Sequence, residues 1–340
     1  MTKTYLISLS PMGKFFFGGD MTFTLNGKDS ENSSYFIKSN LYPQQTSLLG
    51  MLRFLILTNA GADIFCDGKI ANKEKAADLI GGSSFTVGKK QVSFGAIERI
   101  SPCFLMDEKA KEATLHLNAI GREWAFEVNE DGSIISDYEA KKSCKPIDEG
   151  IFLPDLRNGI TKEDKHEKKD GGLFKQENLT FNNFDKNGNK IHDYKFAFYA
   201  EVDEKVGLEK YSGQLVSLGA DSSVFAITIK EDVFKEPTVS TCDKFKGEYV
   251  VLTSPSYMED ADKLNVAFAI TKVVPFKFLV TTVDTKSYNR INKAIDASER
   301  YNLYDRGSVF FFKNAEDKQK FIEKLESHAD FRQIGYNYHN

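Results

Sequence analysis

The residues of this chain that could do chemistry together stand around the start of a short apolar segment. Gln45, Thr46 and Ser47 follow Pro43 closely, and Arg53 comes a few residues later. Hydroxyl groups, the amides of a first helical turn and a guanidinium can together hold a phosphate. The sequence leaves a second interpretation of Arg53 open, in which its guanidinium pairs with an internal carboxylate or reaches the surface.

A helix must position these groups, and residues 42–57 predict one. A proline at its start favours an extended approach, and the hydroxyls that follow can accept hydrogen bonds from first-turn amides. From Leu48 to Leu57 only Gly50 and Arg53 interrupt the large apolar side chains. Because the run is about half of the roughly 20 residues that cross a bilayer, we expect a helix buried in the core.

A second candidate group precedes this helix. The segment from Gly13 to Asp20 places one lysine and three consecutive phenylalanines between glycines, after an alternating strand-like run from Tyr5 to Leu9. As structure, the segment predicts an edge strand that enters a turn. As a binding surface, Lys14 would contact a phosphate while exposed rings among Phe15 to Phe17 stacked on bases.

The composition limits where a polyanion could bind. The chain of 340 residues has a net charge of −4 and a pI near 5.9, which argue against coating nucleic acid by bulk electrostatics. The first 60 residues nevertheless carry five lysines or arginines against three acidic residues. Any site for a polyanion must therefore be local.

Motifs of the common enzyme and metal classes are absent from the sequence. The four cysteines and the five histidines fall at no zinc or metalloprotease spacing, and no phosphate-binding loop or nucleophile elbow occurs. The run from Asp185 to Phe196 begins like a calcium loop, but Lys190 and Phe196 stand where glycine and glutamate are needed, so it predicts a turn. We expect no metal, no cofactor and no standard enzyme.

One enzymatic alternative stays open, because folding can unite a histidine with a distant carboxylate as a general acid–base pair. The apolar part of the N-terminus is too short for a signal peptide, and no run is long enough to span a membrane. We therefore expect a cytoplasmic protein.

The order of the predicted elements favours an α+β fold over a doubly wound sheet. Strands, helices and turns are indicated by alternation, by helical spacing and by glycine or proline breaks. The main predictions are a helix over residues 71–80, strands over 92–106 with a break at Ser101-Pro102, a β-hairpin over 214–230, and a helix over 315–328.

The length of the chain predicts two domains. An irregular stretch at residues 235–247 fits a boundary, so we expect an N-terminal domain over residues 1–236 and a smaller one over 237–340. A charged insertion around 107–194 interrupts the first domain. Its part from Gly159 to Gly172 is dense in charge of both signs and predicts a solvated loop or, alternatively, an insertion that contacts a partner.

The segment from Pro43 to Arg53, placed after an N-terminal strand, resembles a signature of CRISPR-associated proteins of the RAMP superfamily. Other segments follow in an order that resembles the type III-B (Cmr) effector complex subunit that caps the 5′ end of the crRNA. These segments are Phe16 to Asp20, Leu218 to Ser223, Arg306 to Phe312, and Ile334 to Asn337. The chain departs from the family pattern at Ala220, where a second glycine is common, and in a C-terminal loop with few glycines.

The resemblance implies two ferredoxin-like (RRM-like) domains with loop insertions and a role in antiviral defence without catalysis. It also implies binding of the crRNA 5′ tag and docking to the large polymerase-like subunit of the Cmr complex and to a neighbouring backbone RAMP subunit. Single-stranded RNA is recognised by stacking and by backbone contacts. The RNA-binding residues carried over are Lys14, Phe16, Phe17, Gln45, Thr46, Ser47 and Arg53, with Arg122 as an addition from the loop that contains it.

Two other functions are compatible with the sequence. One is a RAMP-type, metal-independent endoribonuclease that processes CRISPR repeat RNA with a histidine as general base; the candidates are His116, His166, His192, His328 and His339. The other is a protein-interaction subunit that makes no RNA contact of its own.

Overall fold

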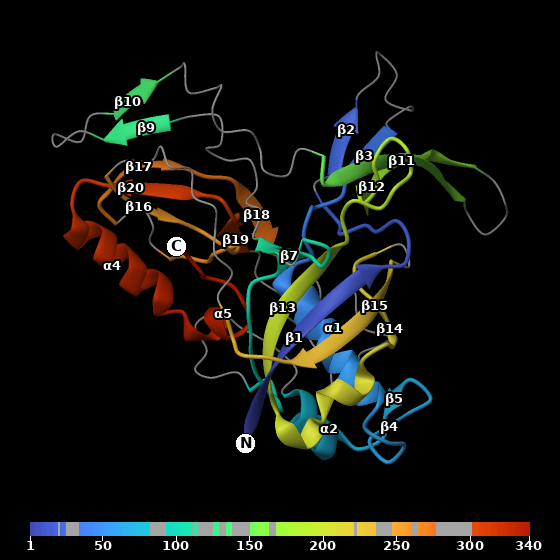
Figure 1. Ribbon diagram of the computed structural model, residues 1–340. Helices are drawn as coiled ribbons and strands as arrows, with labels where there is room; N and C mark the ends of the chain where they lie inside the picture. Colours follow the sequence, from blue (N-terminus) through green and yellow to red (C-terminus); the bar gives the residue numbers. More distant parts are fainter. Residues whose placement is uncertain are drawn as a thin grey trace.

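The computed structural model shows a mixed fold that is rich in strands (Figure 1). It describes residues 1–19, 21–24, 34–81, 93–110, 112–114, 125–128, 134–137, 150–162, 168–220, 223–235, 247–259, 264–276 and 301–340. The mixture of strands and helices agrees with the α+β class expected from the sequence.

The helices are α1 (Gln45–Thr58), α2 (Lys73–Ile80), α4 (Ala315–Glu326) and α5 (Ala329–Gln333), with the 3-10 helices η3 (Glu204–Val206) and η4 (Leu208–Tyr211). The strands of the first half are β1 (Thr2–Pro11), β2 (Met21–Thr24), β3 (Ser34–Lys38), β4 (Phe65–Cys66), β5 (Lys69–Ile70), β6 (Ile97–Ile100), β7 (Phe104–Asp107), β8 (Glu112–Thr114), β9 (Ala125–Val128), β10 (Ile134–Asp137) and β11 (Phe152–Lys162). Those of the second half are β12 (Lys168–Phe181), β13 (Tyr194–Asp203), β14 (Leu215–Ser217), β15 (Val224–Glu231), β16 (Glu248–Val251), β17 (Val266–Ile270), β18 (Val273–Phe276), β19 (Tyr301–Tyr304) and β20 (Val309–Phe312).

The main sheet is antiparallel and has β1 near its centre. Its strand order is β14-β15-β1-β13-β7-β8, and β6 also pairs with β13. The register runs from Thr2 opposite Asp203 to Leu9 opposite Phe196 on one side of β1. The predicted hairpin over residues 214–230 is present as β14 and β15, and the break predicted at residues 101–102 separates β6 from β7.

Helix α1 covers one face of this sheet. Tyr5, Ile7 and Leu9 of β1 share a buried cluster with Leu48 and Leu52 of α1, because alternate residues of a strand face the same side. Truncating a fully buried leucine such as Leu52 to alanine costs about 2–5 kcal/mol. The prediction that residues 42–57 hold a core helix is therefore confirmed.

A long hairpin, β11 and β12, forms a second sheet of order β11-β12-β3-β2 above the main sheet (Figure 1). The solvated loop predicted over residues 159–172 was wrong for the described parts, because β11 continues to Lys162 and β12 begins at Lys168. Two features make a strand possible there. β11 lies at the edge of its sheet, where charges and proline are tolerated, and the Phe174 ring packs over Gly159, where a Cβ would lie 2.1 Å from Phe174 Cζ.

The C-terminal part has a small sheet of order β16-β20-β17, with α4 packed on it. Val250, Phe310 and Phe321 form its own core. Phe331 and Tyr336, which follow α4, belong instead to the large cluster beneath the main sheet. The last residues of the chain therefore connect the two parts. No helix in the described ranges is long and apolar enough to cross a membrane.

Candidate functional site

The segment that follows β1 is fixed on both sides by backbone hydrogen bonds. The Phe16 amide donates to Ser223 Oγ at 3.0 Å, and the Ala220 amide donates to the Phe16 carbonyl at 2.9 Å. On the other side, the Phe17 amide donates to Ser39 Oγ at 2.9 Å. These contacts bring together three stretches that are far apart in the sequence.

A pocket of about 410 Å³ opens beside this segment at the N-terminal end of α1, and we call it the helix-end pocket. It is lined by residues 17–18, by Pro43, Gln44 and Ser47, and by residues 217–220. Gly219 has a φ of 89°, and a Cβ there would lie 2.4 Å from the Phe16 carbonyl oxygen. Because glycine alone tolerates this approach, the 217–220 loop can lie directly against the segment.

The start of α1 carries no anionic group of its own. Gln44 stands at the N-cap without a capping hydrogen bond from its side chain, and the first turn contains no acidic residue. The amides of Ser47 and Leu48 donate to the Gln44 carbonyl at 2.9 and 3.2 Å. The Thr46 amide donates to Tyr336 Oη at 3.4 Å. Since a helix N-terminus concentrates positive partial charge, the pocket favours an anionic ligand.

Gln45 lies outside this pocket and is fully buried, with 0% of its surface exposed. Its amide nitrogen donates to the carbonyls of Ser101 and Ile334 at 2.8 and 3.2 Å. Its amide oxygen accepts from the Cys103 amide at 3.0 Å. The expected phosphate contact of Gln45 is therefore corrected: the side chain ties α1 to the start of β7 and to the C-terminal tail.

Arg53 is also inside the protein, with 3% of its surface exposed. Its guanidinium carbon lies 5.2 Å from the centroid of the Phe94 ring. The residue is two helical turns beyond the start of α1, about 12 Å along the axis. Burial lowers the pKa of Arg53 to about 10, because the charge loses its hydration. The structure thus packs Arg53 into the core, and the phosphate contact expected for Arg53 is corrected.

The two predicted stacking residues are buried as well. Phe16 and Phe17 are 6% and 5% exposed. The Phe17 ring lies 5.3 Å from the Phe196 ring and is stacked on Phe225 at 6.0 Å. Because both rings pack in the core, neither offers an exposed face for stacking in this arrangement. Phe17 and Gly18 nevertheless line the helix-end pocket.

The remaining predicted residues are at or near the surface. Ser47 is exposed and lines the helix-end pocket, and Thr46 is half-buried beside it. Lys14 is exposed and lies in a neighbouring pocket. Arg122 lies outside the described residues.

Sequence reasoning missed Gly18, Gln44 and the 217–220 loop as pocket residues. A signal for the loop was available, because Leu218 to Ser223 is one of the segments that carry the family resemblance. Gly18 and Gln44 also lie in such segments, Phe16 to Asp20 and Pro43 to Arg53, although no periodicity marks either residue.

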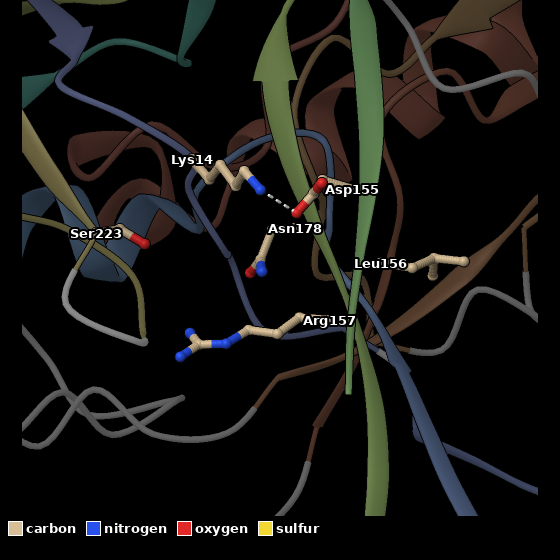
Figure 2. A pocket seen from close by; sticks show the side chains of 6 residues that line it. All are labelled: Lys14, Asp155, Leu156, Arg157, Asn178 and Ser223. Carbon is tan, nitrogen blue, oxygen red and sulfur yellow. Dashed lines mark hydrogen bonds and ion pairs between the residues drawn. The ribbon is translucent and has the colours of Figure 1, made fainter. Parts of the chain in front are cut away.

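The second pocket, of about 390 Å³, is called here the hairpin pocket because β11 and β12 supply most of its wall. It is lined by Lys14, Asp155, Leu156, Arg157, Asn178 and Ser223 (Figure 2). Lys14 Nζ lies 2.5 Å from Asp155 Oδ2. The two pockets meet the same segment after β1, one on each side of the bridge between Phe16 and Ala220.

Two of the described histidines are paired with carboxylates, and in one pair His339 Nε2 lies 3.3 Å from Glu326 Oε1. His192 Nδ1 lies 2.7 Å from Asp107 Oδ2, and its ring is stacked on Tyr194 at 4.8 Å. The Asp107 carboxylate also accepts the amides of Lys109 and Asp193, which helps to hold the pKa of Asp107 below its ordinary value against the opposing effect of burial. Within the described ranges, no cluster of three or more His, Cys, Asp or Glu could hold a metal ion.

Comparison with known proteins identifies relatives of this fold. Two solved chains match over nearly the full length. One, from a cryo-EM structure of the Type III-B Cmr-beta bound to cognate target RNA and AMPPnP, has a TM-score of 0.52 and 14% identity and covers 98% of this chain and 95% of its own. The other, from Cmr-beta bound to cognate target RNA, has a TM-score of 0.52 and 16% identity, with coverages of 99% and 96%. No curated protein matches the sequence.

At these identities the structural matches show the fold. The model of a family described as CRISPR-associated protein (Cas_Cmr3) matches residues 130–339, which is more than half of the chain. The resemblance found in the sequence is thereby confirmed at the level of the family: this chain belongs to the Cas_Cmr3 family of CRISPR-associated proteins.

Proposed function

We propose that this chain is a non-catalytic RNA-binding subunit of a type III-B CRISPR (Cmr) effector complex and binds the 5′ tag of the crRNA in the helix-end pocket. One observation carries the proposal. The pocket unites the segment after β1, the start of α1 and the 217–220 loop, which are three of the segments that carry the family resemblance. They meet at a helix N-terminus that lacks a side-chain cap, where a phosphate is favoured.

The contacts we assign to RNA are mostly made by the backbone. Ser47 lines the pocket together with Gly18 and Gly219, and we assign its hydroxyl and the backbone at the two glycines to the RNA. Such contacts hold the phosphodiester chain and position it. Phe16, Phe17, Gln45 and Arg53 act beneath this surface, since each is less than a tenth exposed.

We further propose that both parts of the chain are variants of a ferredoxin-like unit, whose four antiparallel strands stand in the order fourth, first, third, second. In the main sheet, β15-β1-β13-β7 fits this order, with α1 and α2 after β1 and the two 3-10 helices after β13. In the C-terminal part, β16-β20-β17 supplies the first, third and second strands. An isolated bridge joins Leu252, next to β16, to His339 near the chain end, and we assign the chain end as the fourth strand.

The domain boundary near residue 237 belongs to the same proposal, as do the partners and the location. The relatives of known structure are chains of RNA-bound Cmr-beta assemblies. By analogy, this chain docks in the cytoplasm to the large polymerase-like subunit and to a neighbouring backbone RAMP subunit.

Ser47→Asp tests the RNA site. A carboxylate in the first turn of α1 stabilises the helix through its dipole but repels a phosphate in the pocket. We expect affinity for a single-stranded RNA with the repeat-derived 5′ sequence to fall by about tenfold or more, with no loss of folding stability. Affinity is measured by fluorescence anisotropy of the labelled RNA, and stability by urea unfolding.

Ala315→Asp is the matched control, because it places the same charge in the first turn of α4, at an exposed residue outside both pockets. Equal RNA affinity of Ser47→Asp and Ala315→Asp would overturn the helix-end site.

The His192–Asp107 pair favours a second candidate, the metal-independent endoribonuclease, because a carboxylate can orient a histidine as a general base. The same binding mixtures, run on a denaturing gel with repeat RNA, separate the two functions. Intact RNA is the expected result. Cleavage that disappears in His192→Ala would show that the chain is a ribonuclease instead.

A further inference from the structure

The hairpin pocket has a polar face that follows from the register of two strands. Asp155 stands opposite Asn178, and Arg157 stands opposite Gln176, across the β11–β12 pair. Because side chains alternate along a strand, Asp155 and Arg157 point to one face, and Leu156 points to the other. Figure 2 shows this division, with Leu156 turned away from the space that the remaining side chains share.

Asn178 supplies a side-chain amide to this pocket. The residue is 5% exposed, and its amide oxygen accepts from Gln176 Nε2 at 2.9 Å. The residue is one of those that line the pocket. In Figure 2 the amide lies between Lys14 and Arg157. Because an amide nitrogen carries two donor hydrogens, Asn178 can donate to an acceptor that a ligand brings into the pocket.

The charges around Asn178 define what that ligand is. Among the described residues that line the pocket, Lys14 and Arg157 are cationic and Asp155 is anionic. The ion pair of Lys14 with Asp155 is open to solvent, since the two side chains are 57% and 40% exposed. An exposed pair of this kind is weak and can exchange Asp155 for another anion. A phosphodiester carries one negative charge and several acceptor oxygens.

The pocket also lies on the path of an RNA that occupies the helix-end pocket. Ser223 lines the hairpin pocket and accepts the Phe16 amide, while Ala220 lines the helix-end pocket and donates to the Phe16 carbonyl. An RNA strand that leaves the helix-end pocket therefore passes only the backbone of Phe16 before it reaches the hairpin pocket.

We infer that the hairpin pocket is a second RNA subsite that takes one nucleotide of the single strand beyond the helix-end pocket. Lys14 and Arg157 bind its phosphodiester, and the Asn178 amide donates a hydrogen bond to an acceptor of the nucleotide. The ion pair between Asp155 and Lys14 breaks when the RNA binds. Asp155 is then an internal competitor that stands in for the phosphate in the free chain. This inference rests on the proposed function, because the helix-end pocket must hold the adjoining RNA.

Asp155→Asn tests the competition. The variant keeps the size of the side chain and removes the charge that competes for Lys14. We expect affinity for the tag RNA to rise by about two- to fivefold, the range that the loss of one exposed ion pair allows. Asp63→Asn is the matched control, because Asp63 forms a similar exposed pair with Lys75 at 2.7 Å on another part of the chain. Its affinity should equal that of the wild type.

Arg157→Gln tests the phosphate contact. We expect affinity to fall by about three- to tenfold and the slope of log affinity against log salt to fall by about 0.7, the value for one phosphate contact on a single strand. A shortened RNA that fills the helix-end pocket alone should bind Asp155→Asn, Arg157→Gln and the wild type equally. Both positions are at least partly exposed on an edge strand, so the variants are expected to fold, and circular dichroism checks this.

The outcomes separate the two proposals. If Ser47→Asp weakens RNA binding and the two hairpin-pocket variants match the wild type with the longer RNA, the second subsite is wrong and the helix-end site stands. If Ser47→Asp has no effect on RNA affinity, the proposed function itself is wrong, whatever the hairpin-pocket variants do. A third outcome would mean that the pocket binds a free anion and would overturn the RNA subsite. In it, inorganic phosphate abolishes the difference in RNA affinity between Asp155→Asn and the wild type, whereas another salt of equal ionic strength does not. The length of the RNA then has no influence on this difference.

Discussion

The motif from Pro43 to Arg53 has an open end and a closed end. At its start, Pro43, Gln44 and Ser47 line a pocket with an uncapped helix N-terminus. Gln45 and Arg53 of the same motif face inward and are 0% and 3% exposed. The difference teaches that residues grouped by one sequence signature divide between holding a ligand and holding the chain together.

The closed end is a junction with the C-terminal part. Arg306 is 2% exposed, its guanidinium carbon lies 3.8 Å from the centroid of the Tyr42 ring, and its Nη1 donates to the Cys103 carbonyl at 2.9 Å. Asn337, which has a φ of 58°, exchanges hydrogen bonds with the backbone of Tyr257. The late segments of the family resemblance, Arg306 to Phe312 and Ile334 to Asn337, therefore stabilise the buried side of the start of α1. The open end is exposed to solvent.

Gly335→Ala is expected to break the closed end with the largest effect. A Cβ at this position would lie 1.9 Å from Gln45 Nε2 and 2.6 Å from the Ser101 carbonyl oxygen, and the φ of Gly335 is +84°. The variant must displace the buried amide of Gln45 and adopt a strained backbone, so we expect a loss of about 3–5 kcal/mol in the free energy of unfolding. Urea unfolding followed by circular dichroism measures it.

Gly188→Ala separates the contact from the backbone strain. Gly188 has a similar φ of +80°, but a Cβ there meets nothing within 4 Å. We expect this control to lose about 1–2 kcal/mol. Equal losses at Gly335 and Gly188 would show that the junction adjusts freely and that the closed end is not rigid.

Gln45→Leu is the next largest test. It removes three buried hydrogen bonds and leaves the carbonyls of Ser101 and Ile334 and the Cys103 amide without that partner, so we expect a loss of about 2–4 kcal/mol. Gln214→Leu is the control, because Gln214 exchanges two hydrogen bonds with Asn59 at the surface, where water replaces them. There we expect a loss below about 1 kcal/mol. A Gln45 variant as stable as the Gln214 variant would contradict the structural role of Gln45.

The sequence predicted those features that depend on local patterns. The buried helix at residues 42–57, the hairpin of β14 and β15 and the break before β7 all follow from periodicity and from glycine or proline. The strands β11 and β12 were missed because their pairing with β3 decides their structure, and the charges along them resemble those of a loop.

The residues predicted for the RNA site divide between the surface and the core. The start of α1 forms a wall of the helix-end pocket, and Ser47 lines it. The sequence could not show that Gln45, Arg53, Phe16 and Phe17 point inward, because that depends on contacts with residues as distant as Ile334 and Phe225. Asp155 and Asn178 come together only through strand register, so no spacing in the chain reveals them.

Arg53→Met is expected to have the smallest effect on RNA affinity. It is therefore the sharpest test of the difference between the open and the closed end. The side chain keeps its length against Phe94 while the charge is removed. Because the guanidinium is 3% exposed and lies in neither pocket, affinity for the tag RNA should stay within about twofold of the wild type, against the tenfold loss expected for Ser47→Asp.

The pH dependence of stability identifies the closed environment of Arg53. Burial lowers its pKa to about 10 in the folded chain, below the value near 12.5 that the unfolded chain keeps. The unfolded state therefore binds more protons between these values, so the wild type gains stability relative to Arg53→Met as the pH rises from about 9 to 11. Urea unfolding of both proteins at these pH values measures the difference.

A tenfold loss of RNA affinity in a folded Arg53→Met protein would mean that this arginine reaches the RNA after a rearrangement. The division into an open and a closed end would then apply to the free chain alone.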